Sequence, residues 1–252
     1  MSGSTIAVAG ATGRLGRHVV DVLTEQGHQV VPMSRATGVD VITGEGLDEA
    51  LTGVEAVIDV ASWHASDQEA AAGFFATATR NLHRAGRRAG ADRIVAASII
   101  GADKATGGFI AAQQVHEAAH LAGPLPARLL RAAQFHELVG QLLEWRQGDI
   151  VHVPNLPTQL VAARTVAEEL VRLAVDPAEP DATAPIPEIA GPRRESMAEA
   201  AALLGAREGI EVVGVDNPAM PDADLAAAGA FLPSPHAKLA GPAFAEWLET
   251  RD

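Results

Sequence analysis

Three glycines in one short segment constrain the fold of this chain more than any other feature of its sequence. The apolar stretch Thr5–Ala9 runs directly into Gly10-Ala11-Thr12-Gly13-Arg14-Leu15-Gly16, and apolar side chains at helical spacing follow. In such a strand–loop–helix unit the first glycine permits a tight turn, the second lets backbone approach a pyrophosphate, and the third lets the helix pack on the strand. The helix N-terminus adds free N–H groups that bind phosphates. The segment predicts a dinucleotide-binding loop, and the alternative is a structural turn with no ligand. The residues expected to hold the cofactor here are Gly10, Thr12, Gly13, Arg14, Leu15 and Gly16.

Short β-branched segments alternate with longer alanine-rich segments over the first half of the chain. We expect buried strands at Thr5–Ala9, Gln29–Val31, Ala56–Val60, Ile94–Ala97 and Ala127–Leu130. We expect helices at Arg14–Gln26, Asp67–Arg88 and Ile110–Leu121. Alternation of this kind predicts an α/β fold in which a parallel sheet carries helices on both faces, a doubly wound arrangement.

The distribution of proline divides the chain. Only Pro32 lies in the first 120 residues, so regular strands and helices are favoured there and irregular connections later. The elements expected after that point are helices at Phe135–Arg146, Val166–Val175, Met197–Leu204 and Pro242–Thr250, with strands at Ile150–Val153 and Ile210–Val215. We therefore expect a dinucleotide-binding domain over residues 1–134. A smaller C-terminal α+β lobe over residues 135–252 would pack on it as part of one continuous unit.

Composition excludes several classes of function. The formal net charge is −13, which argues against binding to nucleic acid or to anionic membranes. No apolar run approaches the roughly 18 residues of a membrane-spanning helix, and no basic flank precedes the first apolar stretch, so we expect neither a span nor a secretory signal. The absence of cysteine removes disulfides, zinc–thiolate sites and thiol catalysis. The composition favours a soluble, cytoplasmic protein that acts on a small molecule, and it leaves the oligomeric state open.

The spacing of the glycines resembles that of the short-chain dehydrogenase/reductase superfamily. Further runs make the chain similar to its atypical, NmrA-like NAD(P)H-binding branch. The runs that carry this resemblance are Gly53–Ile58, Arg93–Ser98, Leu129–Arg131, Val166-Ala167 and Phe244–Leu248. The chain departs from the branch at Ala132, where a proline is usual. The resemblance implies a Rossmann fold and a nicotinamide cofactor.

The end of the second predicted strand indicates which cofactor is used. NAD sites typically place Asp or Glu about 20 residues after the glycines, where a carboxylate binds the ribose hydroxyls. This chain has Ser34 and Arg35 there, and a hydroxyl with a guanidinium suits a 2′-phosphate. We therefore predict that NADP(H) is preferred over NAD(H), the alternative being that Arg35 is a solvated surface residue. The family lays the adenine where Asp40 and Val41 stand, although four residues after Arg35 leave room for only a stub of a third strand.

The catalytic pair of the classical family members is missing. Those members use Ser, Tyr and Lys, with Tyr and Lys four residues apart on one helical face. Ser98 matches the serine, but Phe109 stands at the tyrosine position and Gln113 at the lysine position. The chain contains no tyrosine, so no phenol can act in its place. Gln113 could still hydrogen-bond the cofactor ribose.

A second motif lies in the same predicted helix. His116-Glu117-Ala118-Ala119-His120 matches the HExxH pattern of zinc proteases. The third ligand of the longer motif would fall on Pro126, which cannot bind metal. We therefore expect no metal, and His116 and His120 are expected to be surface or partly buried helix residues. The resemblance gives Glu117 a structural role.

Loops that follow the predicted strands supply the remaining candidates. Ala61 and Ser62 are expected beside the cofactor, Trp63, Phe109 and Phe135 in a flat apolar pocket, and His64 and His136 as proton donors beside Ser98. The alternative for each histidine is an exposed loop position, and for each aromatic residue a place in the core. Two functions follow: an NADPH-dependent reductase of a small planar carbonyl or quinone, or a non-catalytic redox sensor that binds the cofactor.

Overall fold

The computed structural model describes residues 3–63, 67–144, 146, 150–178, 184–217 and 219–250. Its largest sheet has seven strands, all parallel: β1 (Thr5–Ala9), β2 (Gln29–Met33), β3 (Ala56–Asp59), β4 (Arg93–Ile99), β5 (Ala127–Ala132), β8 (Glu188–Ala190) and β11 (Lys238–Leu239). Their order across the sheet is β11-β8-β5-β4-β3-β1-β2. The sheet therefore grows in both directions from β1, with β2 on one side of it and the later strands on the other, as in a doubly wound fold.

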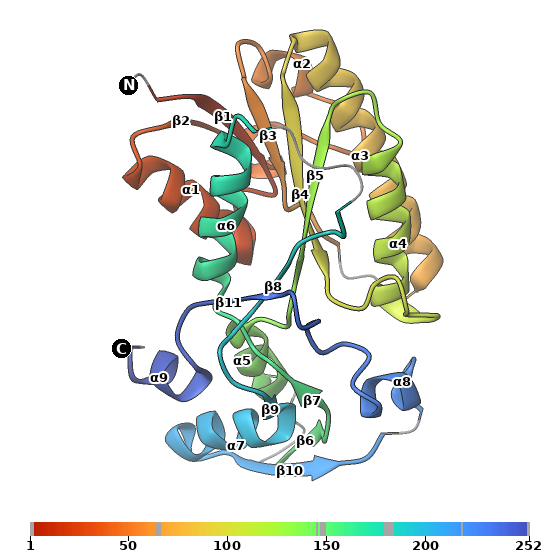
Figure 1. The fold of residues 1–252 in the computed structure, drawn as a ribbon, viewed down its shortest axis with the longest axis vertical. Coiled ribbons are helices and arrows are strands. Elements are labelled where there is room, and N and C mark those ends of the chain that lie inside the picture. Colours follow the sequence, from red (N-terminus) through yellow and green to blue (C-terminus); the bar gives the residue numbers. More distant parts are fainter. Residues whose placement is uncertain are drawn as a thin grey trace.

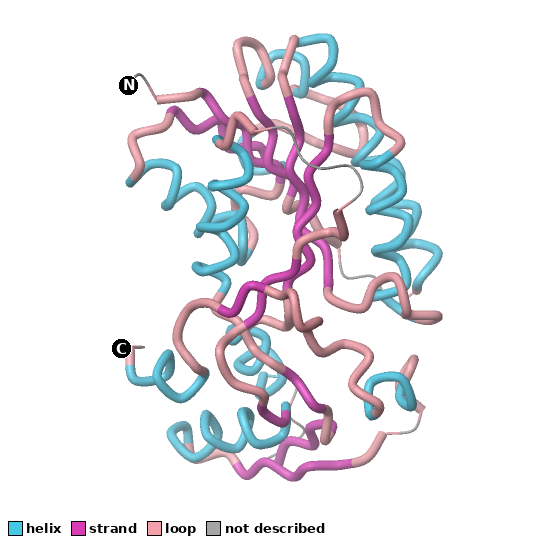
Figure 2. Tube along the Cα trace, in the orientation of Figure 1, coloured by secondary structure: helices cyan, strands magenta, loops and turns pink. Residues whose placement is uncertain are grey.

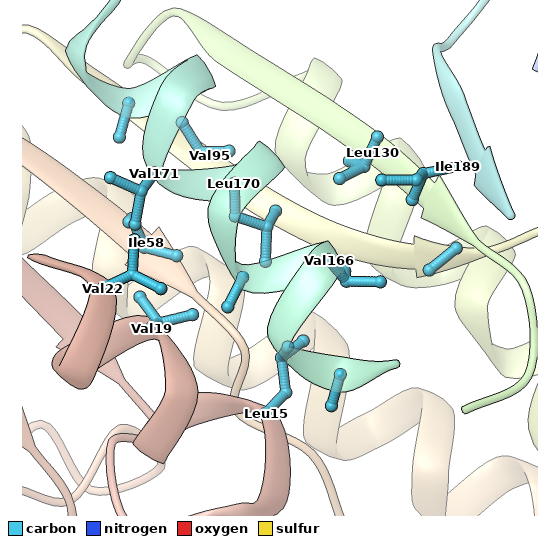
Figure 3. Close-up of a cluster of buried hydrophobic side chains, with 14 of the residues drawn as sticks. Leu15, Val19, Val22, Ile58, Val95, Leu130, Val166, Leu170, Val171 and Ile189 are labelled. Atoms are coloured by element: carbon cyan, nitrogen blue, oxygen red, sulfur yellow. The ribbon is translucent and has the colours of Figure 1, made fainter. Parts of the chain in front are cut away.

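Helices cover both faces of this sheet (Figure 1). One face carries α1 (Arg14–Glu25) and α6 (Ala163–Val175), and the other carries α3 (Gln68–Ala89) and α4 (Gly108–Leu121). Successive strand residues point to opposite faces, so Ile6 and Val8 of β1 pack toward α1 and α6, whereas Ala7 packs toward α3. Figure 3 shows the first of these layers, in which Val19, Val166 and Leu170 lie against the sheet. The predicted α/β fold is confirmed.

The connection between β2 and β3 is short. It contains a 3₁₀ turn at Arg35–Thr37 and one turn of helix, α2 (Leu47–Ala50), and in the part of the chain that the structure describes no strand lies between them. The stub of a third strand expected from the sequence is therefore absent. Asp40 and Val41 lie in a turn, in which Gly44 N–H donates to the Asp40 carbonyl at 2.8 Å.

A smaller lobe lies at one end of the main sheet (Figure 2). Its elements are α5 (His136–Glu144), β6 (Ile150–Pro154), β7 (Pro157–Thr158), β9 (Glu195–Ser196), α7 (Met197–Glu208), β10 (Glu211–Val215), α8 (Ala223–Ala227) and α9 (Phe244–Glu249). Strands β6 and β10 pair in parallel, and β7 pairs with β9 antiparallel. Between these elements the chain returns to the main layer to contribute α6, β8 and β11, so residues after 134 belong to both parts.

Each part has its own apolar core. In the lobe, Val139 and Leu143 of α5 pack with Leu204 of α7 and Phe244 of α9. The sequence predicted α5, β6, α7, β10 and α9 of this lobe. It did not predict β7, β9 and α8 of the lobe or β8 and β11 of the main sheet, which are only two to five residues long. Within the described ranges, no helix combines the length and apolarity needed to cross a bilayer.

Candidate functional site

A cavity of about 1400 Å³ lies where β1, β2, β3, β4 and β5 end. This is the crevice at the carboxyl ends of the strands in which open α/β sheets bind ligands. The predicted cofactor residues that line it are Gly10, Thr12, Gly13, Arg14, Leu15, Ser34, Arg35, Asp40, Val41, Ala61, Ser62 and Gln113. Gly16 lies beneath the loop, outside the cavity lining. The structure thus brings the glycine loop and the turn after β2, which the sequence predicts to bind the two ends of a dinucleotide, to the wall of one cavity.

The glycine loop has the geometry that its sequence predicts. Gly10 has a φ of +80°, and a Cβ there would lie 2.8 Å from the Val60 carbonyl oxygen. A Cβ on Gly16 would lie 2.0 Å from the Gly10 carbonyl oxygen, so only glycine lets α1 pack this closely. Gly13 is the N-cap of α1 and has no side chain to accept hydrogen bonds from the first turn, which leaves the N–H groups of the helix N-terminus open toward the cavity.

Arg14 connects this loop to the smaller lobe. Its Nη1 donates a 2.9 Å hydrogen bond to Oε1 of Gln141 on α5, and both residues line the cavity. The lobe therefore contributes directly to the wall that faces the glycine loop. Sequence reasoning missed Gln141 because its contact with Arg14 joins positions far apart in the chain.

The turn after β2, where the sequence predicts the adenosine of the cofactor, forms one part of the cavity wall. Ser34 caps the 3₁₀ turn, and its backbone N–H donates to Thr37 Oγ1 at 2.9 Å. Arg35 is exposed on the cavity lining, and among the described residues its guanidinium has no hydrogen bond or ion pair. Asp40 Oδ1 accepts from the Ile42 N–H at 2.7 Å, so this carboxylate is engaged within its own turn. Asn81 of α3 fixes the turn, because its Nδ2 donates to the Val41 carbonyl at 2.9 Å.

The hydroxyl of Ser98 is engaged in a buried polar network. Ser98 is 4% exposed, and its Oγ donates to Glu117 Oε1 at 2.6 Å. Glu117 also accepts two bonds from Arg131, from Nε at 2.8 Å and from Nη2 at 2.7 Å. These bonds raise the pKa of the Arg131 guanidinium, which also lies 3.2 Å from Asp103. Glu117 thus has the structural position that the resemblance implies, and the Ser98 proton points to it.

Phe109 and Gln113 line the cavity from the same helix. Phe109 packs against Phe75 of α3, with ring centroids 5.8 Å apart. Gln113 is 5% exposed, and its Oε1 has no hydrogen-bond partner among the described residues. Where the family has tyrosine and lysine, this chain therefore presents a phenyl ring and a neutral amide to the cavity.

The end of the cavity beside Phe109 is apolar and aromatic. The predicted Trp63 packs against Phe74 with centroids 6.2 Å apart, and the predicted Phe135 lines the same cavity. Sequence reasoning missed Phe74 and Phe75, and it also missed Ile110 and Leu138 of the lining. The helical pattern of α3 predicted that this helix packs, but not that Phe74 and Phe75 meet the ligand crevice.

Of the two histidines expected as proton donors, His136 lies outside the lining of this cavity. His136 is fully buried between Phe244 and Trp247 of α9, with centroids 5.4 and 5.1 Å away. Burial lowers the pKa of its imidazole to about 4, so the ring is neutral at physiological pH. The predicted role of His136 as a proton donor from a loop therefore does not fit its position, because helix α9 covers its side chain. His64 lies outside the described residues.

The histidines of the HExxH motif are more buried than expected. His116 is 2% exposed and His120 is fully buried, so the prediction that they are surface or partly buried residues is wrong. The reason is that α4 packs closely along α3, which turns this face of α4 inward. His116 reaches the cavity lining, whereas His120 lies behind it.

Comparison with known proteins agrees with this description. Residues 10–132 match the NAD(P)H-binding family. No curated protein matches the chain in sequence. Among solved structures, a UDP-N-acetylglucosamine 4-epimerase from Bacillus cereus is 18% identical, with a TM-score of 0.69 over 98% of this chain and 94% of that one.

Two further structures bear on the cofactor. A short-chain dehydrogenase/reductase superfamily protein from Agrobacterium tumefaciens with bound NAD is 17% identical, with a TM-score of 0.64 over 84% of this chain and 85% of that one. An NADPH-dependent quinone oxidoreductase from Escherichia coli is 18% identical, with a TM-score of 0.57 over 90% of this chain and 87% of that one. At these identities the likeness concerns the fold. The predicted resemblance to the superfamily is confirmed, and the NmrA-like branch stays a prediction. Residues 10–132 thus match the NAD(P)H-binding family, and the chain as a whole shares the fold of these solved structures.

Proposed function

We propose that this protein is an NADPH-dependent reductase of a small planar carbonyl or quinone. The observation that carries the proposal is the continuity of one cavity, which joins the glycine loop at Gly10 and Gly13 to the aromatic end at Trp63, Phe109 and Phe135. A bound nicotinamide cofactor would supply a hydride at that aromatic end. A flat conjugated substrate fits between aromatic side chains better than a flexible one does.

The turn after β2 supports the preference for NADPH. Arg35 has no partner among the described residues, and Ser34 beside it offers a hydroxyl. Asp40 is the nearest carboxylate in sequence, and it accepts hydrogen bonds from its own turn. Arg35 would thus bind a 2′-phosphate through charge-assisted hydrogen bonds, while no acid stands at the usual NAD position to repel it.

The substrate end contains no strong proton donor among the described side chains. The Ser98 proton points to Glu117, Phe109 has no acidic group, and burial lowers the pKa of His116 to about 4. A quinone suits such a site because hydride addition gives a delocalised oxyanion that needs little help from a general acid. The structural likeness to a quinone oxidoreductase agrees with this substrate class at the level of the fold.

Turnover of NADPH with a panel of substrates tests the proposal. Quinones and simple ketones of matched size are each mixed with the protein, and loss of the reduced-nicotinamide absorbance is followed. We expect quinone-dependent oxidation that is faster with NADPH than with NADH. Phe135→Ala should raise the KM for the quinone, and the exposed Val213→Ala in β10 serves as a matched control.

The second candidate is a non-catalytic sensor that binds NADP(H). The missing phenol and the commitment of Ser98 to Glu117 favour it. A sensor would bind NADPH in equilibrium titrations but would oxidise it with neither substrate class. That combination of results would replace the reductase by the sensor.

A further inference from the structure

A buried group of three side chains lies behind the cavity and is not used by the proposed reaction. Asp59 is the last residue of β3, and His116 and His120 lie one turn apart on the inner face of α4. One ligand atom from each residue lies within 4.8 Å of the others, and all three residues are buried. We propose that Asp59, His116 and His120 bind one divalent transition-metal ion of the zinc class. The proposal is independent of the reductase assignment.

Two atoms of this group face each other without a well-formed hydrogen bond. Asp59 Oδ2 and His120 Nε2 are buried and lie 3.3 Å apart as an ion pair, and neither has a hydrogen bond of good geometry among the described residues. Ligand atoms about 2.1 Å from a tetrahedral zinc ion are separated by about 3.4 Å, so this spacing is that of two zinc ligands. Imidazole nitrogen and carboxylate oxygen are both common zinc ligands.

The charge of the group points the same way. Asp59 is 1% exposed, and within the described chain its ionic contact is with His120 and not with a Lys or Arg. A buried carboxylate without a permanently charged partner is costly, and a divalent cation would balance it.

Further contacts hold each ligand in place. Asp59 Oδ1 accepts from the Ala61 N–H at 3.0 Å, which leaves Oδ2 for the metal. The His120 Nδ1 lies 3.1 Å from Nε2 of His83, and Nδ1 of His116 lies 3.2 Å from Thr79 Oγ1. Metal-binding imidazoles and carboxylates usually have such outer partners, which fix the ring orientation.

Binding requires a change of tautomer but no loss of protons. The Leu125 N–H donates to His83 Nδ1 at 3.3 Å, so without metal the His83 proton is on Nε2 and the His120 proton is on its own Nε2, facing Asp59. With metal on His120 Nε2, that proton moves to Nδ1 and is donated to His83. The His83 proton then moves to Nδ1, and the Leu125 N–H loses its acceptor. The weak 3.3 Å contact is thus lost. The His116 ring hydrogen-bonds Thr79 and the Ala97 backbone, so its coordination also displaces one of these contacts, and metal coordination offsets both losses.

The site differs from that of a zinc protease. In those enzymes the glutamate of HExxH is the general base, but here Glu117 accepts hydrogen bonds from Ser98 and Arg131 and is held by them. His116 reaches the cavity lining, so an ion would enter from the cavity. We therefore expect a bound metal without peptidase activity.

Cobalt binding tests the proposal on the full chain without an affinity tag. The protein is treated with a chelator, freed of it, and titrated with Co²⁺, whose visible absorption reports four-coordinate binding. We expect one Co²⁺ per chain, displaced by Zn²⁺, and a rise in Tm when Zn²⁺ is added. Asp59→Asn and His120→Gln should each lower the affinity at least about tenfold, since each removes one ligand.

Two histidines outside the group provide controls. His136→Phe changes another buried histidine, and His152→Ala changes an exposed one, and both variants should bind Co²⁺ as the parent chain does. NADPH binding and circular dichroism confirm that each variant is folded. If a ligand variant fails to fold, the Zn²⁺-dependent change in the Tm of the parent chain decides. Absence of stoichiometric Co²⁺ and of that change, or unchanged binding in His120→Gln, would overturn the proposal.

Discussion

Ser98 donates its hydroxyl proton to Glu117 across 2.6 Å, and Arg131 holds the same carboxylate from the other side. The hydroxyl that matches the family serine therefore has its proton directed into the protein. Toward the cavity, the Ser98 oxygen can therefore accept hydrogen bonds but not donate one. The serine in this chain is thus suited to orient a donor on a ligand rather than to protonate a substrate.

Substitution of Ser98 by alanine should affect stability more than catalysis. We expect the variant to lose about 1–3 kcal/mol of unfolding free energy, because Glu117 loses a charge-assisted hydrogen bond. Its kcat with a quinone should fall less than about threefold, a small change beside the 10²–10⁴-fold typical of general acid catalysis. Urea unfolding and steady-state kinetics measure the two effects. The exposed Ser234→Ala, away from the cavity lining, is the control, and a large loss of kcat at unchanged stability would show that Ser98 is catalytic.

Arg35→Ala should remove the preference for NADPH. A charge-assisted contact with a phosphate contributes roughly 1.5–3 kcal/mol, so the parent chain should bind NADPH about tenfold or more tightly than NADH. Titrations followed by tryptophan fluorescence measure both affinities, since Trp63 lines the cavity. Arg17→Ala alters an exposed arginine of α1 outside the cavity lining and should keep the preference. Equal affinities in the parent chain would contradict the assignment.

Restoring the missing pair should favour ketones over quinones. Phe109→Tyr with Gln113→Lys places a phenol and an amine on the face of α4 that lines the cavity. General acid catalysis contributes roughly 10²–10⁴-fold, and a ketone needs it more than a quinone does. The ratio of ketone to quinone turnover should therefore rise in the double variant. Phe109→Tyr alone separates the phenol from the amine, and rapid ketone reduction by the parent chain would mean that another acid is present.

Burial of His136 should make the folded state less stable in acid. Its pKa is lowered to about 4, against about 6.5 in an unfolded chain, so the unfolded state binds more protons between these values. The free energy of unfolding should be fully present above about pH 6.5 and should decrease as the pH falls toward 4, by up to about 1.4 kcal/mol per pH unit for this one group. Urea unfolding over that range measures the slope.

The variant His136→Phe should reduce this slope, because it removes the group that titrates. His152→Ala, at an exposed position, should leave the slope unchanged. Equal slopes in the parent chain and His136→Phe would show that other groups account for the whole loss of stability in acid.

Much of the main layer could be predicted because its signals are local. Thr5–Ala9, the glycines and the first turn of α1 are consecutive, so one segment predicts a strand, a loop and a helix together. The cavity follows from the same rule, since loops after parallel strands meet at one edge of the sheet. For this reason Ser34, Ala61 and Phe135, which follow β2, β3 and β5, all appear in its lining.

The environments of the histidines could not be predicted, because they depend on distant packing. His136 follows a strand as an exposed donor would, but Phe244 and Trp247 from the last helix cover it. The HExxH motif lacks a third ligand nearby in sequence, whereas the fold brings Asp59 from β3 beside it. Strands β8 and β11 are too short to give a pattern. They join the sheet because β5 offers an edge to β8, and β8 in turn offers one to β11.

The missing third strand has a consequence for how copies of this protein can meet. It leaves β2 at the border of the sheet, where unpaired backbone could recruit a strand from another molecule. Gln29 donates inward to Ser4 and Met33 accepts inward from Gly10, so by alternation Pro32 faces outward. Proline has no N–H to donate, and its carbonyl already accepts from the Thr37 hydroxyl at 2.9 Å. Pro32, the one proline in the first 120 residues, thus hinders another strand from pairing with the free edge of β2, and so disfavours aggregation through that edge.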